Sequence, residues 1–365
     1  MKEITLLGID LAKNVFQLIG LDKHHKAVMK KRVSRTKLQE YAETLPRCTI
    51  LMEACGSSNH WGRTFSAMGH EVKLISPQHV TPYIGNHKND YKDTEGILEA
   101  GTRPRTKFVS IKTIEQQDMQ SLLRVRERLV ENRVSLSNQI RGLLLEYGID
   151  IAKGFKHLKE KLPQLLDASN AELSVPMKAV IADCYEEFKS LSERITSYDK
   201  KLECISTEQE YCRLLRTIPG VGPITAVSVY AAVGNGSQFK NGREMAAHIG
   251  LVPKQHSSGE KRVLLGITRK GHADLKKVLI HGARSVVRHA NKKTDRRSEW
   301  INTLLLKKHK NVVATAVANR TARIAWAVLQ SAKPYHAHDV ELIKSGACSP
   351  QPYHALHNIE GLRAC

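Results

Sequence analysis

The chain has 365 residues, of which 57 are Lys or Arg and 36 are Asp or Glu, so its formal charge is +21. A hydrophobic fraction of 41% excludes a wholly disordered chain and leaves room for two or three domains. No apolar run reaches the roughly 18 residues that a membrane helix needs, the N-terminus lacks a secretion signal, and the seven cysteines form no CxxC pair. We therefore expect a basic cytoplasmic protein with reduced thiols, whose polyanionic partner is nucleic acid.

Residues 1–105 alternate between strand-like and helix-like patterns, which predicts an α/β domain with a net charge of +5. Short apolar runs that end at polar residues predict the strands, and longer amphipathic stretches predict the helices. We expect strands at residues 4–10, 14–21, 27–33, 49–52 and 71–75, and helices at residues 58–68 and from about 92 to 100.

Four acidic residues of this domain stand at the ends of expected elements. Asp10 and Glu53 each close an apolar strand, and strand ends are where open α/β sheets present functional side chains. Asp90 and Asp93 are three residues apart, so they would share one face at a helix start. Converging carboxylates repel one another unless divalent cations neutralise them, and Mg²⁺ prefers carboxylate oxygens. The set therefore predicts a metal site, whereas each acid taken alone is better explained as a helix cap or a solvated turn residue.

The middle segment, residues 106–210, carries a net charge of −1 and a heptad pattern. Leucines recur every seven residues from Leu122 to Leu143, and apolar residues from Met177 to Ile205 alternate spacings of four and three. We expect two long helices that form a coiled-coil spacer, joined by an irregular connection at residues 148–175. The pattern suits dimerisation, but it does not say whether the partner helix belongs to the same chain.

Most of the positive charge lies in a basic segment, residues 211–332, where residues 211–330 carry a net +17. Such a local field favours a nucleic-acid-binding domain over a domain that is merely well solvated. Residues 218–223 are typical of a helix–hairpin–helix loop, in which Gly220 and Gly222 would let the backbone approach a phosphate. We expect helices at residues 224–233, 244–249, 274–290 and 312–330, a polar stretch at 257–271, and a flexible tail at 333–365.

Residues 251–259 place two serines beside glycine and basic side chains. Ser257 or Ser258 would act as an exposed nucleophile with phosphates held nearby, or the loop would contact phosphate without any chemistry. The residue types do not decide between these two interpretations. The basic residues around the serines are Lys254, Lys261, Arg262, Arg269 and Lys270.

Six segments match one known family in the expected order: residues 8–17, 52–57, 88–90 together with Asp93, 218–223, 250–259 and 280–284. With these segments the chain resembles the transposases of the insertion sequence 110 family, and in particular its 1111 subgroup. The resemblance covers about residues 4–330. At Thr94 and Gly96 the family usually has alanine, so the packing of that helix is expected to differ.

The resemblance implies a RuvC-like domain, of the ribonuclease-H-like kind, in which the four acids Asp10, Glu53, Asp90 and Asp93 bind Mg²⁺, with Mn²⁺ as a substitute. It implies that the serine directly before the glycine, Ser258, is the nucleophile, ahead of Ser257. It further implies guidance by a structured bridge RNA from the element's own non-coding end, double-stranded DNA as the substrate, and assembly as a dimer of dimers.

We therefore predict a DNA recombinase of a bacterial insertion sequence, cytoplasmic and associated with the nucleoid when active. Its expected parts are a metal-binding domain (1–105), a helical spacer (106–210), a mainly helical basic transposase domain (211–332) and a tail (333–365). Two alternatives stay open. One is a metal-dependent junction endonuclease in which water attacks and Ser258 only contacts phosphate; the other is a non-enzymatic architectural DNA-binding protein.

Overall fold

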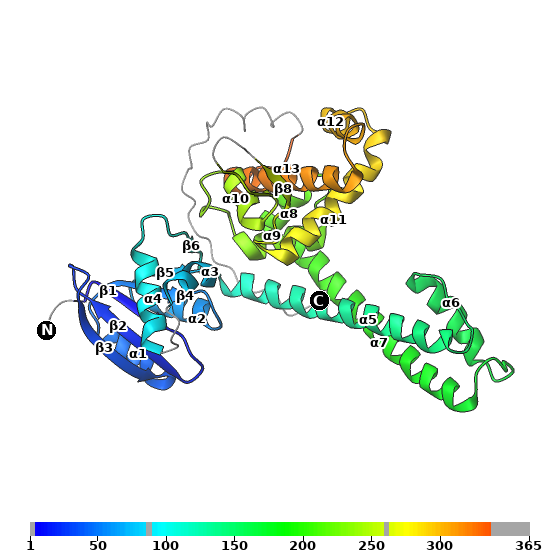
Figure 1. Ribbon diagram of the computed structural model, residues 1–365, viewed down its shortest axis with the longest axis horizontal. Helices are drawn as coiled ribbons and strands as arrows, with labels where there is room; N and C mark the ends of the chain where they lie inside the picture. The colour runs from blue at the N-terminus through cyan, green and yellow to red at the C-terminus, as the bar shows by residue number, and fades with distance from the viewer. Residues whose placement is uncertain (1–3, 85–89, 259–262, 337–365) are drawn as a thin grey trace. The chain divides into compact units, whose positions relative to one another are not determined.

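The computed structural model describes residues 4–84, 90–258 and 263–336, and Figure 1 traces the chain through its strands and helices. Two compact units make up the chain, Met1–Glu115 and Gln116–Cys365, called the N-terminal and the C-terminal unit below. The finer division expected from the sequence, with boundaries at residues 105, 210 and 332, stays a prediction.

A six-stranded mixed sheet forms the centre of the N-terminal unit. Its strands are β1 (Leu6–Asp10), β2 (Val15–Leu21), β3 (Ala27–Ser34), β4 (Thr49–Glu53), β5 (Glu71–Ile75) and β6 (Phe108–Val109). They lie in the order β3-β2-β1-β4-β5-β6, with β1, β2 and β3 antiparallel to one another in turn and β4 and β5 parallel to β1. The middle residues of β1 and β4 are all buried, as expected for central strands that are covered on both faces.

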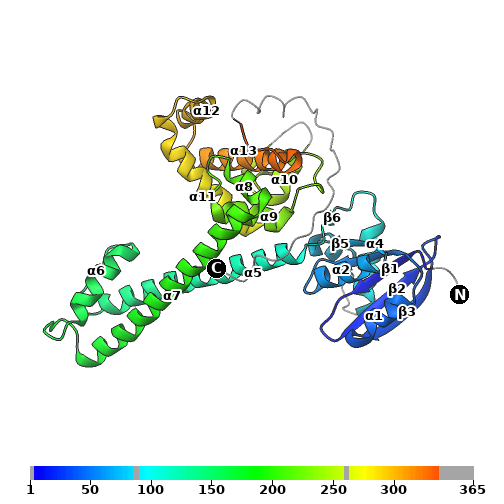
Figure 2. The same ribbon diagram turned by 180° about the vertical axis from the view of Figure 1, so that it is seen from behind.

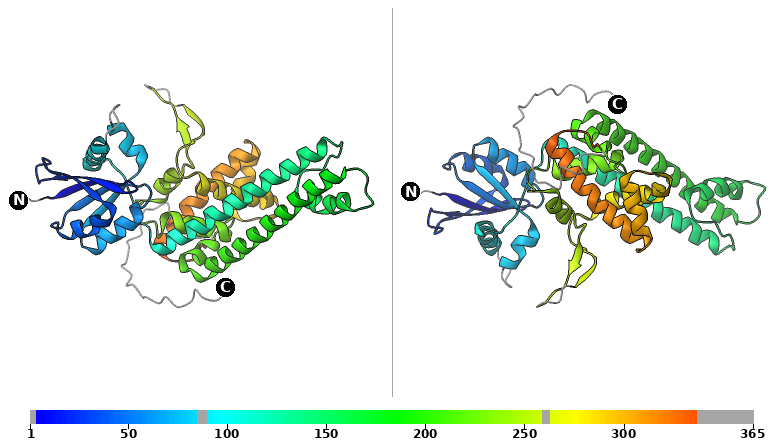
Figure 3. Two further views of the ribbon diagram at one scale, coloured as in Figure 1. Left: turned by 90° about the horizontal axis from the view of Figure 1, so that it is seen from below. Right: turned by 90° about the horizontal axis from the view of Figure 1, so that it is seen from above.

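Helices cover both faces of this sheet, because successive residues of a strand point to opposite sides. They are α1 (Leu38–Glu43), α2 (Ser58–Ala67), α3 (Pro77–Val80) and α4 (Asp90–Thr102), with short 3-10 turns η1 (Arg35–Lys37) and η2 (Thr81–Tyr83). α1 and α2 pack on the face that carries Leu7 and Phe16, and α3 and α4 pack on the face that carries Leu51 and Ile75. Figure 3 shows the strands lying between these helical layers.

Three helices of the C-terminal unit form an elongated hairpin: α5 (Ile114–Leu145), α6 (Phe155–Leu166) and α7 (Val175–Glu208). The heptad residues Leu129 and Leu136 of α5 lie in one hydrophobic core with Ile181 and Phe188 of α7. Arg126 of α5 also forms an ion pair with Asp199 of α7. The two long helices are therefore confirmed, and the heptad of each finds a partner helix within the same chain.

The connection between the two long helices is not irregular throughout, as the sequence had led us to expect, because it contains α6. Leu158, Leu162 and Leu165 of α6 are fully buried in the core shared with α5 and α7. These leucines follow helical spacing, but the segment also contains Pro163, which normally marks a helix end, and several lysines. Figure 2 shows α6 beside the N-terminal part of α7.

The rest of the C-terminal unit is a second, mainly helical core. It contains α8 (Glu210–Arg216), α9 (Pro223–Val233), α10 (Gly242–Ile249), α11 (Ala273–His289), η3 (Ala290–Lys292), α12 (Arg296–Leu305) and α13 (Lys310–Ser331). α13 is the central helix, since residues along its whole length are buried, and it packs against α8, α10, α11 and α12. The mixed α/β fold with a mainly helical C-terminal part confirms the coarse fold class, and none of the described helices is long and apolar enough to cross a membrane.

A small antiparallel hairpin, β7 (Pro253–Gln255) and β8 (Leu264–Ile267), was not expected from the sequence. The stretch 257–271 is therefore not simply a polar loop, because its residues 264–267 form a strand. Every residue of both strands is exposed, so no alternation of buried and exposed positions marked them.

Candidate active site

Two of the predicted acids lie next to each other at one edge of the sheet. β1 and β4 are parallel, and their register pairs Ile9 with Met52, so the following residues Asp10 and Glu53 close two neighbouring strands side by side. The carboxyl ends of parallel strands meet at the same edge, which is why residues 43 positions apart in the sequence present their carboxylates together.

The third acid, Asp93, comes from α4, and two glycines let this helix approach the strands. A β-carbon on Gly8 of β1 would lie 2.6 Å from Cγ of Leu98, and a β-carbon on Gly101 would overlap the side chain of Leu51. The close fit of α4 on β1 and β4 places its first turn near the strand ends. Asp90 is the first residue of α4, and its side chain lies outside the described residues.

The electrostatics of Glu53 and of its neighbour Cys55 involve all three acids. Burial, and then the negative charge of Asp93, raise the pKa of the Glu53 carboxyl. The neighbouring thiol of Cys55 has its pKa raised to about 11, first by burial and then by the charges of Glu53 and Asp10. The Cys55 sulfur also lies 4.0 Å from the carbonyl oxygen of Leu11, just beyond the end of β1. Asp10, Glu53 and Asp93 therefore act on one small region.

The donor chemistry of this region fits a hard divalent cation, because it consists of carboxylate oxygens that disfavour each other's charge. Among the described residues, however, no group of three or more His, Cys, Asp or Glu side chains is arranged closely enough to hold a metal. The described acids thus make up a partial set. Asp90, the fourth acid expected from the sequence, stays a prediction, because its side chain lies outside the described residues.

The departure from the family pattern at residues 94 and 96 falls on the buried side of α4. Thr94 is fully buried, and a β-carbon on Gly96 would lie 3.1 Å from the side chain of Ile84 and 3.4 Å from the carbonyl of Tyr83. The absent methyl group at residue 96 therefore lets α4 lie close to η2.

The candidate serines belong to the hairpin of the C-terminal unit, where the hydrogen bonds of Ser257 are described. The hydroxyl oxygen of Ser257 accepts hydrogen bonds from Nε2 of Gln255, at 3.0 Å, and from the backbone N–H of Val263, at 3.2 Å. Ser257 is thereby tied into the hairpin. Ser258 follows it as an exposed residue at the end of the described segment. The basic residues Lys254, Arg269 and Lys270 are exposed as well, whereas Lys261 and Arg262 lie outside the described residues.

Glycines hold the base of this hairpin against the helical core. Gly250 (φ 85°) and Gly271 (φ 94°) both adopt left-handed backbone conformations, and they pack backbone against backbone. A β-carbon on Gly271 would lie 2.5 Å from the carbonyl oxygen of Ile249, and one on Gly250 would overlap the carbonyl of Lys270. Hydrogen bonds from Thr268 to Val252 and from His272 to Ile249 close the same junction.

The two glycines of the loop before α9 differ in their surroundings. Gly220 (φ 87°) packs tightly against α11, since its β-carbon would lie 2.6 Å from Val286 and 3.0 Å from the carbonyl of Gly282. Its described role is thus close helix packing. Gly222, in contrast, is exposed at the N-terminus of α9 with no atom near the position of a β-carbon. Of the two, Gly222 is the one open to a phosphate.

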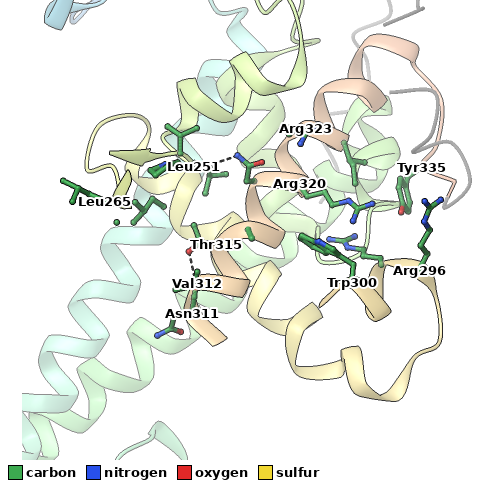
Figure 4. A pocket seen from close by; sticks show the side chains of 18 of the residues that line it. Leu251, Leu265, Arg296, Trp300, Asn311, Val312, Thr315, Arg320, Arg323 and Tyr335 are labelled. Atoms are coloured by element: carbon green, nitrogen blue, oxygen red, sulfur yellow. Dashed lines mark hydrogen bonds between the residues drawn. The ribbon is translucent and has the colours of Figure 1, made fainter. Parts of the chain in front are cut away.

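The sequence did not reveal a cleft of about 1360 Å³ between the hairpin, α12 and α13. Its residues come from four separate segments, within 251–267, 295–300, 311–324 and at Tyr335, so no local motif marks it. Figure 4 shows Trp300, Arg296, Arg320 and Tyr335 gathered at one end and the apolar Leu251 and Leu265 at the other. The cleft is called the arginine cleft below, because four arginines and a single acid, Asp295, line it: Arg296, Arg297, Arg320 and Arg323.

Comparison with known proteins gives consistent matches along the chain. The DEDD transposase family model of IS110 matches residues 7–149, and the model for the transposase IS116/IS110/IS902 family matches residues 212–299. The transposase for insertion sequence element IS1111A of Coxiella burnetii is 46% identical over 92% of each chain. The transposase for element IS1328 of Yersinia enterocolitica is 38% identical over 90% of this chain and 97% of its own.

A more distant relative, the pilin gene-inverting protein of Moraxella bovis, is 23% identical over 91% of this chain and 97% of its own. The first family model covers the strands and the helix that carry the acids, and the second covers the glycine loop, the serine hairpin and α11. With this identity over most of its length, the chain belongs to the IS110 family of transposases, enzymes that cut DNA strands and transfer them.

Proposed function

We propose that the protein recombines DNA through a serine nucleophile, Ser258, together with a divalent-metal site at Asp10, Glu53, Asp90 and Asp93, and that a structured RNA from its own element guides it. The observation that supports the metal site is that Asp10 and Glu53 close neighbouring parallel strands and that the charge of Asp93 acts on Glu53. The exposure of Ser258, beside a Ser257 hydroxyl engaged in the hairpin, supports Ser258 as the nucleophile.

In the proposed reaction the Ser258 hydroxyl loses its proton and its oxygen attacks the scissile phosphorus. A bond between the serine oxygen and phosphorus forms, one bond from phosphorus to a strand oxygen breaks, and the leaving oxygen takes up a proton. The hydroxyl of a second strand then attacks the same phosphorus and restores the serine. A divalent cation at the acids would polarise the phosphate and stabilise charge on its oxygens.

The serine mechanism is tested by trapping. Full-length protein is incubated with DNA that carries the element's end and with RNA transcribed from the element's non-coding flank. The reaction is stopped with denaturant, and protein–DNA adducts are separated by gel electrophoresis. We expect an adduct with the wild type and with Ser257→Ala, and none with Ser258→Ala. Full strand exchange by Ser258→Ala would instead support the endonuclease mechanism, in which water attacks.

Strand exchange, as opposed to cutting alone, is supported by the relative named as a pilin gene-inverting protein. The positive charge concentrated in residues 211–330 supports the binding of RNA as well as DNA. The decisive measurement supplies purified protein with or without the RNA transcribed from the non-coding flank of its element. Recombination that is equally efficient without this RNA would contradict guidance.

We further propose that the hairpin of α5 and α7 supports a homo-oligomer by coiled-coil packing, and that the segment α8–loop–α9 acts as a helix–hairpin–helix. The exposed Val134 and Leu145 of α5 and Val180 of α7 are consistent with a further helix partner. Light scattering of the full-length protein measures the oligomer, which replacement of Val134 and Val180 by glutamate is expected to dissociate.

A further inference from the structure

The arginine cleft has an unbalanced charge that calls for an anion. Its one acid, Asp295, is already engaged: its carboxylate accepts hydrogen bonds from the backbone N–H groups of Arg297 and Ser298 and from the Ser298 hydroxyl, the last at 2.7 Å. Within residues 90–258 and 263–336, no ion pair joins Arg320 or Arg323 to an acid. Among the described residues, Arg320 and Arg323 thus bring two positive charges to the lining without an acid in an ion pair with them.

The arginines also act on each other unfavourably. Burial, and then the positive charges of Arg243 and Arg320, lower the pKa of the Arg323 guanidinium. Holding like charges together in a half-buried cleft is costly, and phosphate oxygens are the acceptors that fit guanidinium groups in pairs. The site therefore matches the phosphates of a nucleotide chain.

The other half of the lining is apolar and aromatic. Such a surface favours an unpaired strand over a duplex, because only the unpaired strand has free base faces. The guanidinium of Arg320 lies over the Trp300 ring, 5.0 Å from its centroid, and offers a flat surface for a base. Leu251, Val252 and Leu265 line the opposite end. A duplex exposes mainly phosphates and groove edges, whereas an unpaired strand can turn its bases toward such surfaces.

The size and position of the cleft suit a strand segment. Its volume of about 1360 Å³ exceeds the roughly 300–1,000 Å³ of small-molecule pockets. Pro253 and Ile267, which face each other at the base of the hairpin, both line it. Since Ser258 is five residues from Pro253, the extended hairpin places it no more than about 17 Å away. A strand in the cleft would therefore reach the proposed nucleophile.

We propose that the arginine cleft binds unpaired nucleotides of the DNA strand that carries the scissile phosphate, with Arg320 and Arg323 on the phosphates and a base stacked on the Trp300–Arg320 pair. This inference rests on the proposed function, because only the serine mechanism brings the cut strand to the hairpin. The cleft would hold the strand open beside Ser258 during exchange.

The test measures binding by the full-length protein in EDTA, so that no cleavage takes place. The probes are a fluorescein-labelled 12-nucleotide DNA strand, the same strand with four abasic sites, an RNA of the same sequence and the 12-base-pair duplex. We expect the wild type to bind the DNA strand tightest, and the abasic strand about tenfold more weakly, since a stacked base contributes about 5- to 150-fold in affinity. This comparison needs no variant.

Variants then locate the site. Arg320→Gln with Arg323→Gln should weaken binding of the DNA strand about tenfold or more, and Trp300→Leu should remove the difference between the normal and the abasic strand. The matched control is Arg124→Gln with Arg194→Gln, which removes the same charge from exposed positions of α5 and α7. Circular dichroism verifies that each variant is folded.

Each other outcome overturns the proposal. Equal affinity for the duplex would mean that the protein binds the strand by general charge attraction alone. Tighter binding of RNA would mean that the cleft binds the guide. Equal affinity for the abasic strand would exclude stacking of a base. Failure of the serine mechanism is separable, because it shows as a missing Ser258 adduct while strand binding in EDTA is unaffected.

Discussion

Glu53 is held in surroundings that oppose its charge, since burial and Asp93 both raise the pKa of its carboxyl. Between its ordinary and its raised pKa, the folded chain binds more protons at this group than the unfolded chain. The free energy of unfolding therefore falls as pH rises through that window, and at neutral pH the ionised carboxylate destabilises the fold.

We predict that Glu53→Gln abolishes strand cleavage. In EDTA the same variant should have a higher thermal unfolding midpoint than the wild type, because its free energy of unfolding rises by up to about 1 kcal/mol. Mg²⁺ should stabilise the wild type and not the variant. The control is Glu71→Gln, because hydrogen bonds from Thr49 and Lys73 lower the pKa of Glu71 and its replacement should not stabilise. Scanning calorimetry measures these midpoints. An unfolding midpoint of the wild type that is the same with and without Mg²⁺ would contradict the metal site.

Arg297 lies at the opposite extreme, as a charged side chain that is only 7% exposed. Its guanidinium donates to the carbonyl of Pro219, at 3.3 Å, and to the Thr321 hydroxyl, at 2.9 Å, so it joins the glycine loop to α12 and α13. We predict that Arg297→Met lowers the free energy of unfolding by about 2–3 kcal/mol, because both acceptors lose their donor. Urea denaturation measures this, with the exposed Arg288→Met as the control; an equal loss in the two variants would refute the role given to Arg297.

At the scale of elements, the contact between the loop before α9 and α11 depends on two facing glycines. A β-carbon on Gly282 would overlap the carbonyl oxygen of Gly220. We predict that Gly282→Ala destabilises the protein by about 1–3 kcal/mol, because α11 must move away from the loop. The matched control is Gly142→Ala in α5, which has open space around it and should stabilise by about 0.5–1 kcal/mol through helix propensity. A neutral Gly282→Ala in thermal unfolding would show that the contact is loose.

The sequence predicted best the elements whose residues are buried on a regular period. The five longer strands of the sheet and helices α2, α4, α5, α7, α9, α10, α11 and α13 all lie close to their expected residues. α6 was missed because it contains Pro163, a residue typical of helix ends, although its leucines follow helical spacing. The β7–β8 hairpin was missed because all the residues of its strands are exposed. Asp10 and Glu53 were accessible to sequence reasoning since each ends an apolar run, whereas Arg320 and Trp300 meet only through the fold.

At the scale of the whole molecule, the charge is divided unevenly. Residues 1–105 carry a net +5, including the acids of the candidate metal site, and residues 211–330 carry +17. DNA affinity should therefore depend on salt through the basic segment and hardly on the acids.

We predict that replacing Lys254, Arg269 and Lys270 together by glutamine makes the slope of log affinity against log salt less steep by about 2–3. The reason is that each of the three charges contributes one phosphate contact. Replacing Lys153, Lys156 and Lys159 near α6 changes the net charge equally and should leave the slope unaltered. Anisotropy titrations of the full-length protein with duplex DNA, from low to high salt, give both slopes. Identical slopes for the two triple variants would mean that net charge alone sets the affinity.

The glycine junction at the base of the serine hairpin also has a consequence for changes in chain length. Gly250 and Gly271 bring both ends of the intervening segment together within the helical core, so the closure is fixed before the hairpin begins. Residues inserted between Ser258 and Val263 would add only the small entropy of a longer loop, about 0.6 kcal/mol for each doubling of its length. We therefore expect that the segment between Gly250 and Gly271 can be lengthened, or replaced by the segment of a related protein, without a change in the packing of the helices that hold it.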